Sequence, residues 1–196
     1  MNISVTILAA GSSTRMGNTN KLLLIYKGKS LIKITCDTLI NSKLKPIIVI
    51  TGFDHKKITN SLPKAIDSVI FNDKWSEGIS TSINLGISSL PDMIDGNMIV
   101  LADMPLIKVE TINKLREAFV KHNGEKIIYA DYLGRQANPV IFPKKYFDGI
   151  QSLKGDLGCK KIINQNKINS LGIAIDSSEV IFDCDTEEDY SNLIKK

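Results

Sequence analysis

The sequence predicts an α/β fold built on a mostly parallel β-sheet. Short apolar runs rich in β-branched residues alternate with segments whose apolar residues recur every three or four positions. Such alternation is typical of parallel strands joined by crossover helices. The 196 residues suffice for one well-buried core, and no repeat, linker or low-complexity stretch divides them. We therefore expect a single domain over residues 1–196.

The first half of the chain predicts three strands, each followed by a helix. Strands are expected where apolar, mostly β-branched residues run together, over 3–9, 47–51 and 68–71. In the first helix, apolar residues at i, i+4, i+7 and i+8 form one face, namely Ile32, Cys36, Leu39 and Ile40. The three helices are expected over 30–42, over 54–62 and from Gly78 onward.

The second half of the chain continues this alternation. A buried strand is expected over 98–102, just before Asp103, and a helix follows over 109–122. Two more strands are expected over 127–130 and 139–142. The last helix is expected to begin at Thr186, because Asp189 three residues later completes a capping-box pattern.

Four expected strand ends carry small or polar residues, at Gly11, Asn72, Asp103 and Asp185. In an open parallel sheet, ligands bind beyond the carboxyl ends of the strands. Asp183 and Asp185 are two residues apart, so on a strand their side chains would share one face. The sequence thus predicts a ligand site along one edge of the sheet.

Composition narrows the class of protein. The net charge of +4 is mild, and the Lys and Arg residues are scattered, which argues against a nucleic-acid surface. No apolar run approaches the roughly 20 residues of a membrane span, and no basic segment precedes the first apolar run as in a signal peptide. We therefore expect a cytoplasmic protein that contacts neither membranes nor nucleic acids. The three cysteines match no disulfide or zinc spacing and are expected to be reduced.

A loop of small residues follows the first strand and runs from Leu8 to Lys21. Its small side chains let the backbone approach a phosphate closely, and successive N–H groups can bind an anion. Arg15 and Lys21 add the positive charge that a triphosphate requires. The loop lacks both the Walker A motif and the G-x-G-x-x-G fingerprint, which argues against an NAD-dependent oxidoreductase. The alternative is an ordinary strand-to-helix turn with exposed basic residues.

The segment LAAGSSTRMG, with the Asn-Lys that follows, resembles the signature loop of the nucleotidyltransferases related to molybdenum-cofactor enzymes. It is most similar to the molybdenum cofactor cytidylyltransferase group. Further segments similar to this family follow in the same order, at 21–24, 72–82, 101–105, 138–140, 155–158 and 183–189. The resemblance implies a Rossmann-like three-layer sandwich of the nucleotide-diphospho-sugar transferase type.

The resemblance also implies roles for individual residues. Arg15, Lys21 and Asp103 would be catalytic, with the two cations bracing the β- and γ-phosphates. Asp103 and Asp185 would bind Mg²⁺, which is usually held by one or two carboxylates and by substrate phosphates. The nucleotide-binding residues would be Leu8, Ala9, Ala10, Gly11, Asn72, Gly78, Ser80 and Ser82.

Acceptor-binding positions follow from the same resemblance, at Asn138, Pro139, Asp156 and Gly158. The chain departs from the family at Cys159-Lys160, where Ala-Arg is typical. This departure leaves the acceptor open, because lysine cannot make the bidentate phosphate contact of arginine.

Several of these residues also have structural readings. Asp103 would close the turn before Pro105. Asp185 would help to begin the last helix, and Ser80 and Ser82 would cap a helix. The residue types alone do not choose between the structural and the functional roles.

The nucleotide and the acceptor are predicted from the same loop. Related guanylyltransferases carry LAGG where this chain has LAAG, and the methyl group of Ala10 narrows the floor under the base, which favours CTP over GTP. We expect transfer of CMP from Mg·CTP to the terminal phosphate of a molybdopterin-type cofactor, with release of pyrophosphate. The alternatives are a guanylyltransferase, another phosphate-acceptor nucleotidyltransferase, or a non-catalytic maturation factor. Such a factor would deliver the cofactor to a molybdenum-enzyme apoprotein.

Overall fold

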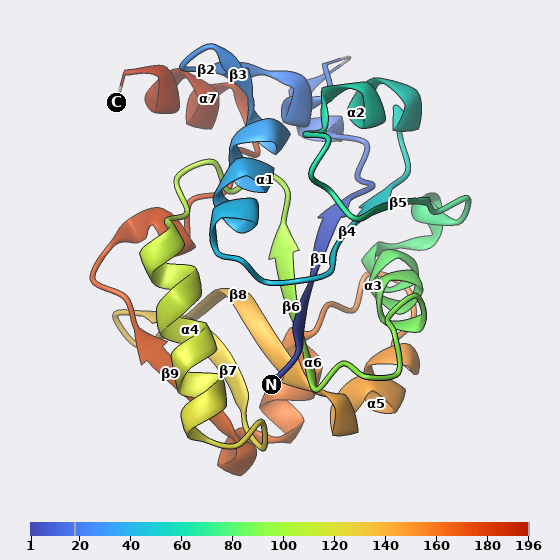
Figure 1. The fold of residues 1–196 in the computed structure, drawn as a ribbon. Helices are drawn as coiled ribbons and strands as arrows, with labels where there is room; N and C mark the ends of the chain where they lie inside the picture. Colours follow the sequence, from blue (N-terminus) through green and yellow to red (C-terminus); the bar gives the residue numbers. More distant parts are fainter. Residues whose placement is uncertain (18, 196) are drawn as a thin grey trace.

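A seven-stranded sheet forms the centre of the protein, in the order β5-β4-β1-β6-β8-β7-β9 (Figure 1). The computed structural model describes residues 1–17 and 19–195. The strands are β1 (Ile3–Ala9), β4 (Ile47–Thr51), β5 (Ser68–Phe71), β6 (Gly96–Leu101), β7 (Ile127–Tyr132), β8 (Arg135–Pro143) and β9 (Ser170–Ala174). Only β8 pairs antiparallel in this sheet, with β6 and β7. The predicted mostly parallel α/β sheet is confirmed.

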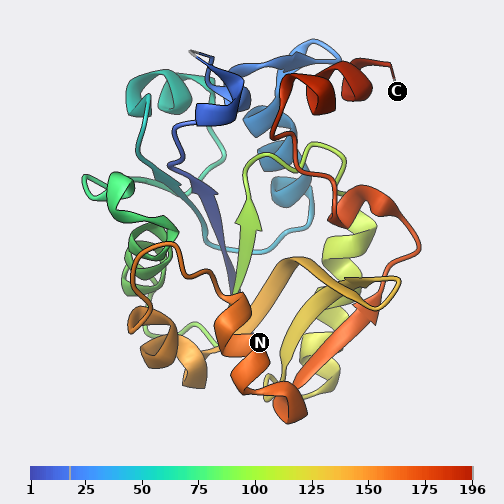
Figure 2. The ribbon, with the colours of Figure 1, turned by 180° about the vertical axis from the view of Figure 1, so that it is seen from behind.

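Helices cover both faces of the sheet, which gives three layers (Figures 1 and 2). One face packs against α1 (Leu31–Asn41), α2 (His55–Ser61) and α4 (Val109–Lys121). The opposite face packs against α3 (Ile79–Ser88), α5 (Phe147–Gln151) and α6 (Lys160–Gln165). In the part of the chain that the structure describes, no helix is both long and apolar enough to cross a bilayer.

The apolar spacing that predicts α1 also decides which of its faces is buried. Ile32, Cys36 and Leu39 are fully buried against the sheet, whereas Ile40 is only partly buried. On the opposite face of the sheet, Ile83 and Ile87 of α3 are buried in the same way. The periodicity of these helices therefore reflects burial against the sheet.

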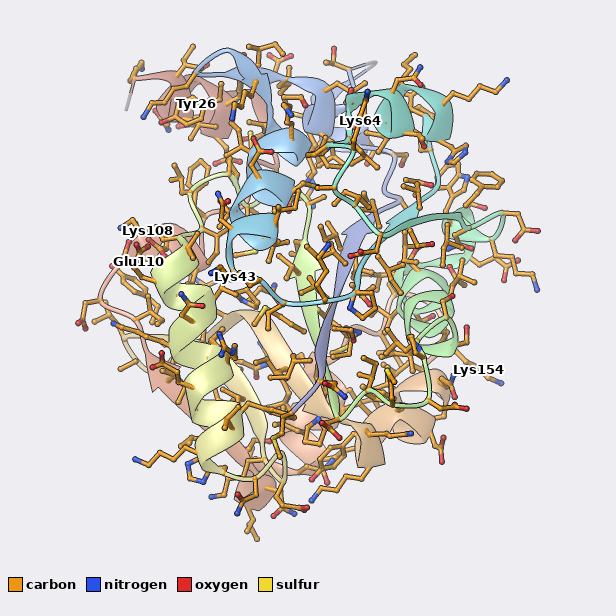
Figure 3. The ribbon with its side chains drawn as sticks, viewed as in Figure 1. Tyr26, Lys43, Lys64, Lys108, Glu110 and Lys154 are labelled. Atoms are coloured by element: carbon orange, nitrogen blue, oxygen red, sulfur yellow. The ribbon has the colours of Figure 1, made fainter. Side chains whose placement is uncertain are left out.

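A small hairpin, β2 (Ile25–Tyr26) with β3 (Lys29–Ser30), lies beside α7 (Glu187–Ile194) at one end of the molecule. The Tyr190 hydroxyl donates to the Ile25 carbonyl at 2.8 Å. Tyr26, labelled in Figure 3, is buried in a cluster with Leu193. These contacts hold the C-terminal helix against a segment that is more than 150 residues away in the sequence.

Helix α7 begins as predicted. Thr186 is its N-cap, and the Asp189 backbone N–H donates to the Thr186 hydroxyl while the Asp189 carboxylate accepts from the Thr186 N–H. The same carboxylate oxygen also accepts from the Asp185 N–H, at 3.2 Å. The capping box therefore fixes the backbone that carries Asp185 as well as the start of the helix.

Glu179 fixes the segment upstream of α7. It lies in the short helix η6 (Ser178–Val180) and is only 3% exposed. The Thr111 hydroxyl donates to it at 2.6 Å, and the ammonium of Lys108, beside the start of α4 in Figure 3, lies 3.0 Å away. A buried carboxylate with this many partners ties η6 to α4.

The expectation that Asp183 and Asp185 lie on a strand is wrong. Residues 182–185 form no regular structure. The Cys184 N–H donates to the Asp103 carbonyl at 3.3 Å, which holds the segment beside the end of β6. Asp183 and Asp185 therefore reach the sheet edge because the backbone between them is hydrogen-bonded to Asp103 after β6, and not because they alternate along a strand.

Candidate active site

A cavity of about 660 Å³ opens beyond the carboxyl ends of β1 and β6. Its volume lies within the range of about 300–1,000 Å³ that is usual for small-molecule sites. Among the predicted residues, those that line it are Leu8, Ala9, Ala10, Gly11, Arg15, Lys21, Gly78, Ser82, Asp103, Asp156 and Asp185. Segments that are up to 177 positions apart in the sequence thus meet at the predicted edge of the sheet.

Backbone hydrogen bonds to both neighbouring strands hold the loop after β1. The Phe53 N–H donates to the Ala10 carbonyl at 3.1 Å, and the Ala102 N–H donates to the Leu8 carbonyl at 3.1 Å. A side chain at Gly11 would point into open space. The loop is therefore fixed at its base while the surface beside Gly11 stays open to a ligand.

Ser13 connects the two cationic parts of the loop. It adopts a left-handed backbone conformation with φ of 55° immediately before η1 (Thr14–Met16), which contains Arg15. Its hydroxyl accepts a hydrogen bond from the Lys21 N–H at 3.2 Å. Lys21 begins η2 (Lys21–Leu23), so Ser13 fixes where the lysine side chain starts.

Two cations and two carboxylates form an ion-paired cluster at one end of the cavity. The Lys21 ammonium contacts both the Asp103 and the Asp185 carboxylates. A guanidinium nitrogen of Arg15 lies 2.8 Å from the second oxygen of Asp185. We call Arg15, Lys21, Asp103 and Asp185 the charge cluster.

The charge cluster keeps its lysine ionised. Burial lowers the pKa of Lys21, but the adjacent Asp103 and Asp185 carboxylates outweigh burial and raise this pKa above its ordinary value. The ammonium therefore remains positive throughout the neutral range. A fixed positive charge inside a mostly buried site is suited to binding phosphate oxygens.

Asp103 is held by its backbone and has one unused oxygen. The Thr35 hydroxyl lies 3.1 Å from the carbonyl of Ala102, the residue before Asp103. Oδ2 of Asp103 contacts Lys21, whereas its Oδ1 is buried and has no hydrogen-bond partner among the described residues. Buried polar atoms normally have partners, so this orphan oxygen is suited to a ligand or an ion.

The donor set fits a hard divalent cation. Asp103 and Asp185 supply carboxylate oxygens that contact the same lysine. Mg²⁺ prefers oxygen ligands and is commonly held by one or two carboxylates together with substrate phosphates. Within residues 1–17 and 19–195, no group of three or more His, Cys, Asp or Glu side chains is arranged to hold a metal.

Asp183 adds a third carboxyl group to the cavity wall. Burial raises the pKa of Asp183 to about 7, and the neighbouring Asp103 and Asp185 carboxylates add to the rise. With this pKa the group is only partly ionised at neutral pH, which limits the negative charge around Lys21.

The opposite end of the cavity is built by the start of α3. Gly78 has φ of +114°, and a Cβ there would lie 2.3 Å from the carbonyl carbon of Gly155. The Ser80 N–H donates to the Gly155 carbonyl at 3.1 Å. Close packing of these backbones brings Asp156 to the cavity wall.

Asn72 does not line this cavity but contacts a residue that does. Its side-chain amide donates to the hydroxyls of Thr81 and Ser82, at 2.8 and 2.9 Å. Ser82 lines the cavity, whereas Asn72 and Ser80 instead line a second cavity of about 710 Å³ on the other side of α3. The structure therefore places Asn72 where it can orient Ser82.

The remaining predicted acceptor residues lie outside the lining of this cavity. Asn138 and Pro139 are on β8, and Gly158 precedes α6. None of the three lines the cavity beside the loop. Of the four predicted acceptor positions, the structure brings only Asp156 to this cavity.

Several lining residues were absent from the sequence-based prediction of the site. They are Ser12, Ser13, Thr14, Leu22, Trp75, Ser76, Ile79 and Leu101. Asp183, which the sequence offered beside Asp185, also lines the cavity. Ser12 to Thr14 fall inside the glycine-rich loop, so its composition was a usable signal. Trp75 packs edge-on against Phe53, with ring centroids 5.7 Å apart, and a Cβ on Gly52 would lie 2.6 Å from the Cβ of Trp75. Nothing in the sequence pattern predicts that Trp75 packs against the residues after β4.

Residues 5–170 match the family described as the MobA-like NTP transferase domain. Purine catabolism protein PucB of Bacillus subtilis (strain 168) is 29% identical over 194 residues, covering 93% of this chain and 91% of that protein. The family match includes the loop after β1 and Asp103, and it ends before Asp183 and Asp185.

Solved structures share the fold. Rv0371c from Mycobacterium tuberculosis H37Rv has a TM-score of 0.87 at 23% identity, covering 100% of this chain and 98% of that chain. Its complex with manganese has a TM-score of 0.84 at 21% identity, with 100% of both chains covered. A nucleotidyl transferase from Methanothermobacter thermautotroptrophicus, Mth528, has a TM-score of 0.84 at 18% identity, covering 98% and 96%. At these identities the likeness establishes the fold, and the expected fold type is confirmed.

Proposed function

Because the chain belongs to the MobA-like NTP transferase domain family, we propose that it transfers a nucleotidyl group from a nucleoside triphosphate to a phosphate-bearing acceptor. Pyrophosphate is the second product. The charge cluster is the observation that carries this proposal. It lies at one end of the cavity that the loop after β1 lines. Cations for a triphosphate and carboxylates for a divalent ion are the groups that this reaction needs.

The proposed reaction is an in-line substitution at the α-phosphorus. A terminal phosphate oxygen of the acceptor forms a bond to the α-phosphorus, and the bond from that phosphorus to the oxygen bridging the β-phosphate breaks. The departing electron pair stays on pyrophosphate. Because the acceptor oxygen is already anionic at neutral pH, no strong general base is required.

The charged residues act through position and charge. Lys21 and Arg15 bind the β- and γ-phosphates and offset the charge that develops on pyrophosphate. Asp103 and Asp185 would hold a divalent ion, which would neutralise phosphate charge when bound. The complex of the structurally similar Rv0371c with manganese supports an ion of this type.

At the opposite end of the cavity, Gly78 and Ser82 form the wall nearest α3. We assign them, with Leu8 to Gly11 from the loop, to the nucleotide. Ser80 and Asn72 then act through the packing of α3 and through the Ser82 hydroxyl. CTP is the proposed nucleotide, since the methyl group of Ala10 narrows the floor under a purine.

The proposed acceptor is a molybdopterin-type cofactor with a terminal phosphate. Similarity of the loop to the cytidylyltransferase group supports it, as do the family-like segments that follow in the same order, among them the run Asp183–Asp189. Asp156 is the acceptor-side residue that lines the cavity, and we assign Asn138, Pro139 and Gly158 to a part of the acceptor path outside this lining.

The nucleotide is tested by thermal shift with CTP, GTP, UTP and ATP in the presence of Mg²⁺. A ligand at about 100 times its Kd stabilises the folded state by about 2.7 kcal/mol, so a tight nucleotide raises Tm measurably. CTP is expected to give the largest rise. A larger rise with GTP would instead identify a guanylyltransferase.

The reaction is tested by pyrophosphate release with the preferred nucleotide, Mg²⁺ and the phosphate-bearing cofactor. Release that requires both the acceptor and Asp103 is the expected result. Nucleotide binding without release, across acceptors that carry a terminal phosphate, would overturn the proposal and favour a non-catalytic maturation and delivery factor.

A further inference from the structure

The carboxylates of the charge cluster are already occupied by cations of the protein itself. Lys21 contacts Oδ2 of Asp103 and Oδ1 of Asp185, and Arg15 contacts Oδ2 of Asp185 at 2.8 Å. Three of the four oxygens therefore face a side-chain cation. The fourth, Oδ1 of Asp103, is buried without a hydrogen-bond partner among the described residues.

This arrangement disfavours a divalent ion that arrives alone. The two positive and two negative groups of the cluster cancel in formal charge, so the cluster itself has little net attraction for a free cation. Asp183, beside the cluster on the same cavity wall, is a further carboxyl group that has no side-chain cation in ion-pair contact among the described residues. An ion that approached Asp103 and Asp185 together would also come close to the Lys21 ammonium, which contacts both carboxylates. The lysine side chain is only 16% exposed, so water screens this repulsion poorly.

A nucleoside triphosphate changes this balance. Its phosphates offer Lys21 and Arg15 new anionic partners along the same cavity wall. When the two side chains turn to the phosphates, the oxygens of Asp103 and Asp185 become available. Arg15 is well placed for this movement, because its side chain is 69% exposed.

We propose that Lys21 and Arg15 serve as internal counter-ions that exclude free divalent metal from Asp103 and Asp185, so that the site accepts the metal only together with a nucleotide. This inference rests on the proposed function, because it assigns the nucleotide phosphates to the same cavity. It makes the metal–nucleotide complex, and not the free ion, the species that the protein recognises.

The test is a Mn²⁺ titration of the nucleotide-free protein, in which electron paramagnetic resonance measures the free ion. The wild-type protein is compared with Lys21→Met, which removes the bridging ammonium and keeps an unbranched side chain. Lys21→Met is expected to bind Mn²⁺ at least about tenfold more tightly than the wild type, because both carboxylates lose their shared cation. Arg15→Met is expected to give a smaller gain, because Arg15 contacts only Asp185.

Lys45→Met is the matched control. Lys45 also pairs with an aspartate, Asp67, at 2.9 Å, but it does not line the cavity. The same loss of one positive charge at this position is expected to leave Mn²⁺ affinity at the wild-type value. A gain equal to that of Lys21→Met would show a general charge effect and overturn the proposal.

A second titration adds a non-hydrolysable CTP analogue. In the wild type the analogue is expected to tighten Mn²⁺ binding, and by reciprocity Mn²⁺ tightens binding of the analogue. Circular dichroism shows whether Lys21→Met folds. If it does not fold, the gain in Mn²⁺ affinity of Arg15→Met, whose side chain is exposed, and the coupling between Mn²⁺ and the analogue in the wild type still test the proposal.

The outcomes separate the inference from the proposed function. Tight Mn²⁺ binding by the nucleotide-free wild type, with no gain in Lys21→Met, overturns the inference and leaves the proposed reaction standing. Absence of Mn²⁺ binding in every variant, with and without the analogue, overturns both.

Discussion

Asp103 combines a fixed backbone, an ion pair with Lys21 and an unpartnered buried oxygen. No other residue of the charge cluster has all three features. Its position two residues before Pro105, at the end of a buried strand, was visible in the sequence. The structure adds that its carbonyl binds the segment that carries Asp185. Asp103 is thus the residue through which the two proposed metal-binding segments are joined.

Replacing Asp103 by Asn is expected to reduce pyrophosphate release by about 10²–10³-fold, the usual effect of removing one preorganised charged contact. The fold is expected to persist, because Asn keeps the shape of the side chain. Asp37→Asn, at an exposed ion pair with Lys29, is the control and should retain full activity. Circular dichroism checks the fold of both variants. Wild-type activity in Asp103→Asn would contradict the metal assignment.

Thr35 is expected to act as a positioning residue for Asp103. Its buried hydroxyl lies 3.1 Å from the Ala102 carbonyl. Thr35→Val keeps the shape but removes the hydroxyl, which costs roughly 1 kcal/mol of stability for one hydrogen bond. We also expect a weaker apparent affinity for the activating metal, measured from the dependence of the rate on Mg²⁺ concentration. Thr35→Ser should restore both, whereas loss of stability alone in Thr35→Val would contradict a positioning role.

Sequence alone placed the charged residues of the site better than the polar ones. Asp103 lies just beyond the end of β6, as the strand-end argument requires, and Lys21 and Asp185 meet it there although neither follows a strand. Asn72 also follows a strand, but its amide turns away from the loop cavity to bind Thr81 and Ser82. A strand-end position fixes where the backbone of a residue lies, whereas the neighbouring hydroxyl groups decide where its side chain points.

Among the elements, the contact between the start of α3 and residues 155–156 depends on the absence of a side chain at Gly78. A Cβ there would lie 2.3 Å from the Gly155 carbonyl carbon, and φ is +114°. Gly78→Ala is therefore expected to displace the 155–156 backbone and to weaken nucleotide binding about tenfold or more, as measured by titration calorimetry.

Gly28→Ala is the matched control for Gly78→Ala. Gly28 also has a positive φ, +79°, but nothing lies within 4 Å of a Cβ built there. It therefore reproduces the backbone strain without the clash, and its expected effect is a modest loss of stability with unchanged nucleotide affinity. Equal losses of affinity in the two variants would attribute the effect to strain and contradict the packing argument.

The capping box of α7 is expected to make stability depend on pH. Chiefly the Thr186 hydroxyl, with N–H donors of Thr186 and Asp185, holds the pKa of Asp189 below its ordinary value of 3.8. A lowered folded-state pKa gives stability that is present above pH 3.8 and is lost as pH falls through the folded-state pKa.

Thermal unfolding between about pH 2 and pH 7 tests this dependence in the wild type and Asp189→Asn. The wild type should be the more stable at neutral pH, and the difference in Tm should shrink towards zero as the solution becomes more acidic than pH 3.8. A difference in Tm that does not change with pH would contradict the role of the Asp189 charge.

The elements that sequence predicted well are those that contain a continuous apolar run. β1 and β4 have the expected bounds, because such runs are required in strands covered on both faces. β5 also has the expected bounds, because its last three residues form an apolar run although the strand is partly exposed at the sheet edge. The strand predicted over 139–142 is longer in the structure, Arg135–Pro143. Its first half was missed because those residues are less buried and more polar. β9 gave no signal because Gly172 interrupts its few apolar residues, and the two-residue strands β2 and β3 are too short to contain an apolar run.

At the scale of the whole molecule, the order of the strands explains why distant segments form one site. β1 lies between β4 and β6, so the loop after β1 is flanked by the ends of both neighbours. The β6 side carries Asp103 and receives the irregular segment 182–185, whereas the β4 side carries Gly52 beneath Trp75. Strand order therefore assigns the charged and the less charged ends of the cavity to opposite sides of the loop.

This arrangement leads to the central claim, that a triphosphate lies against the loop while its metal ion lies on Asp103. The most direct measurement is a crystal structure of the protein with Mg²⁺ and a non-hydrolysable CTP analogue. We predict phosphate oxygens beside Gly11 and Lys21, with the ion bound to Asp103. A nucleotide bound away from the loop after β1, or an ion out of reach of the Asp103 carboxylate, would contradict the account.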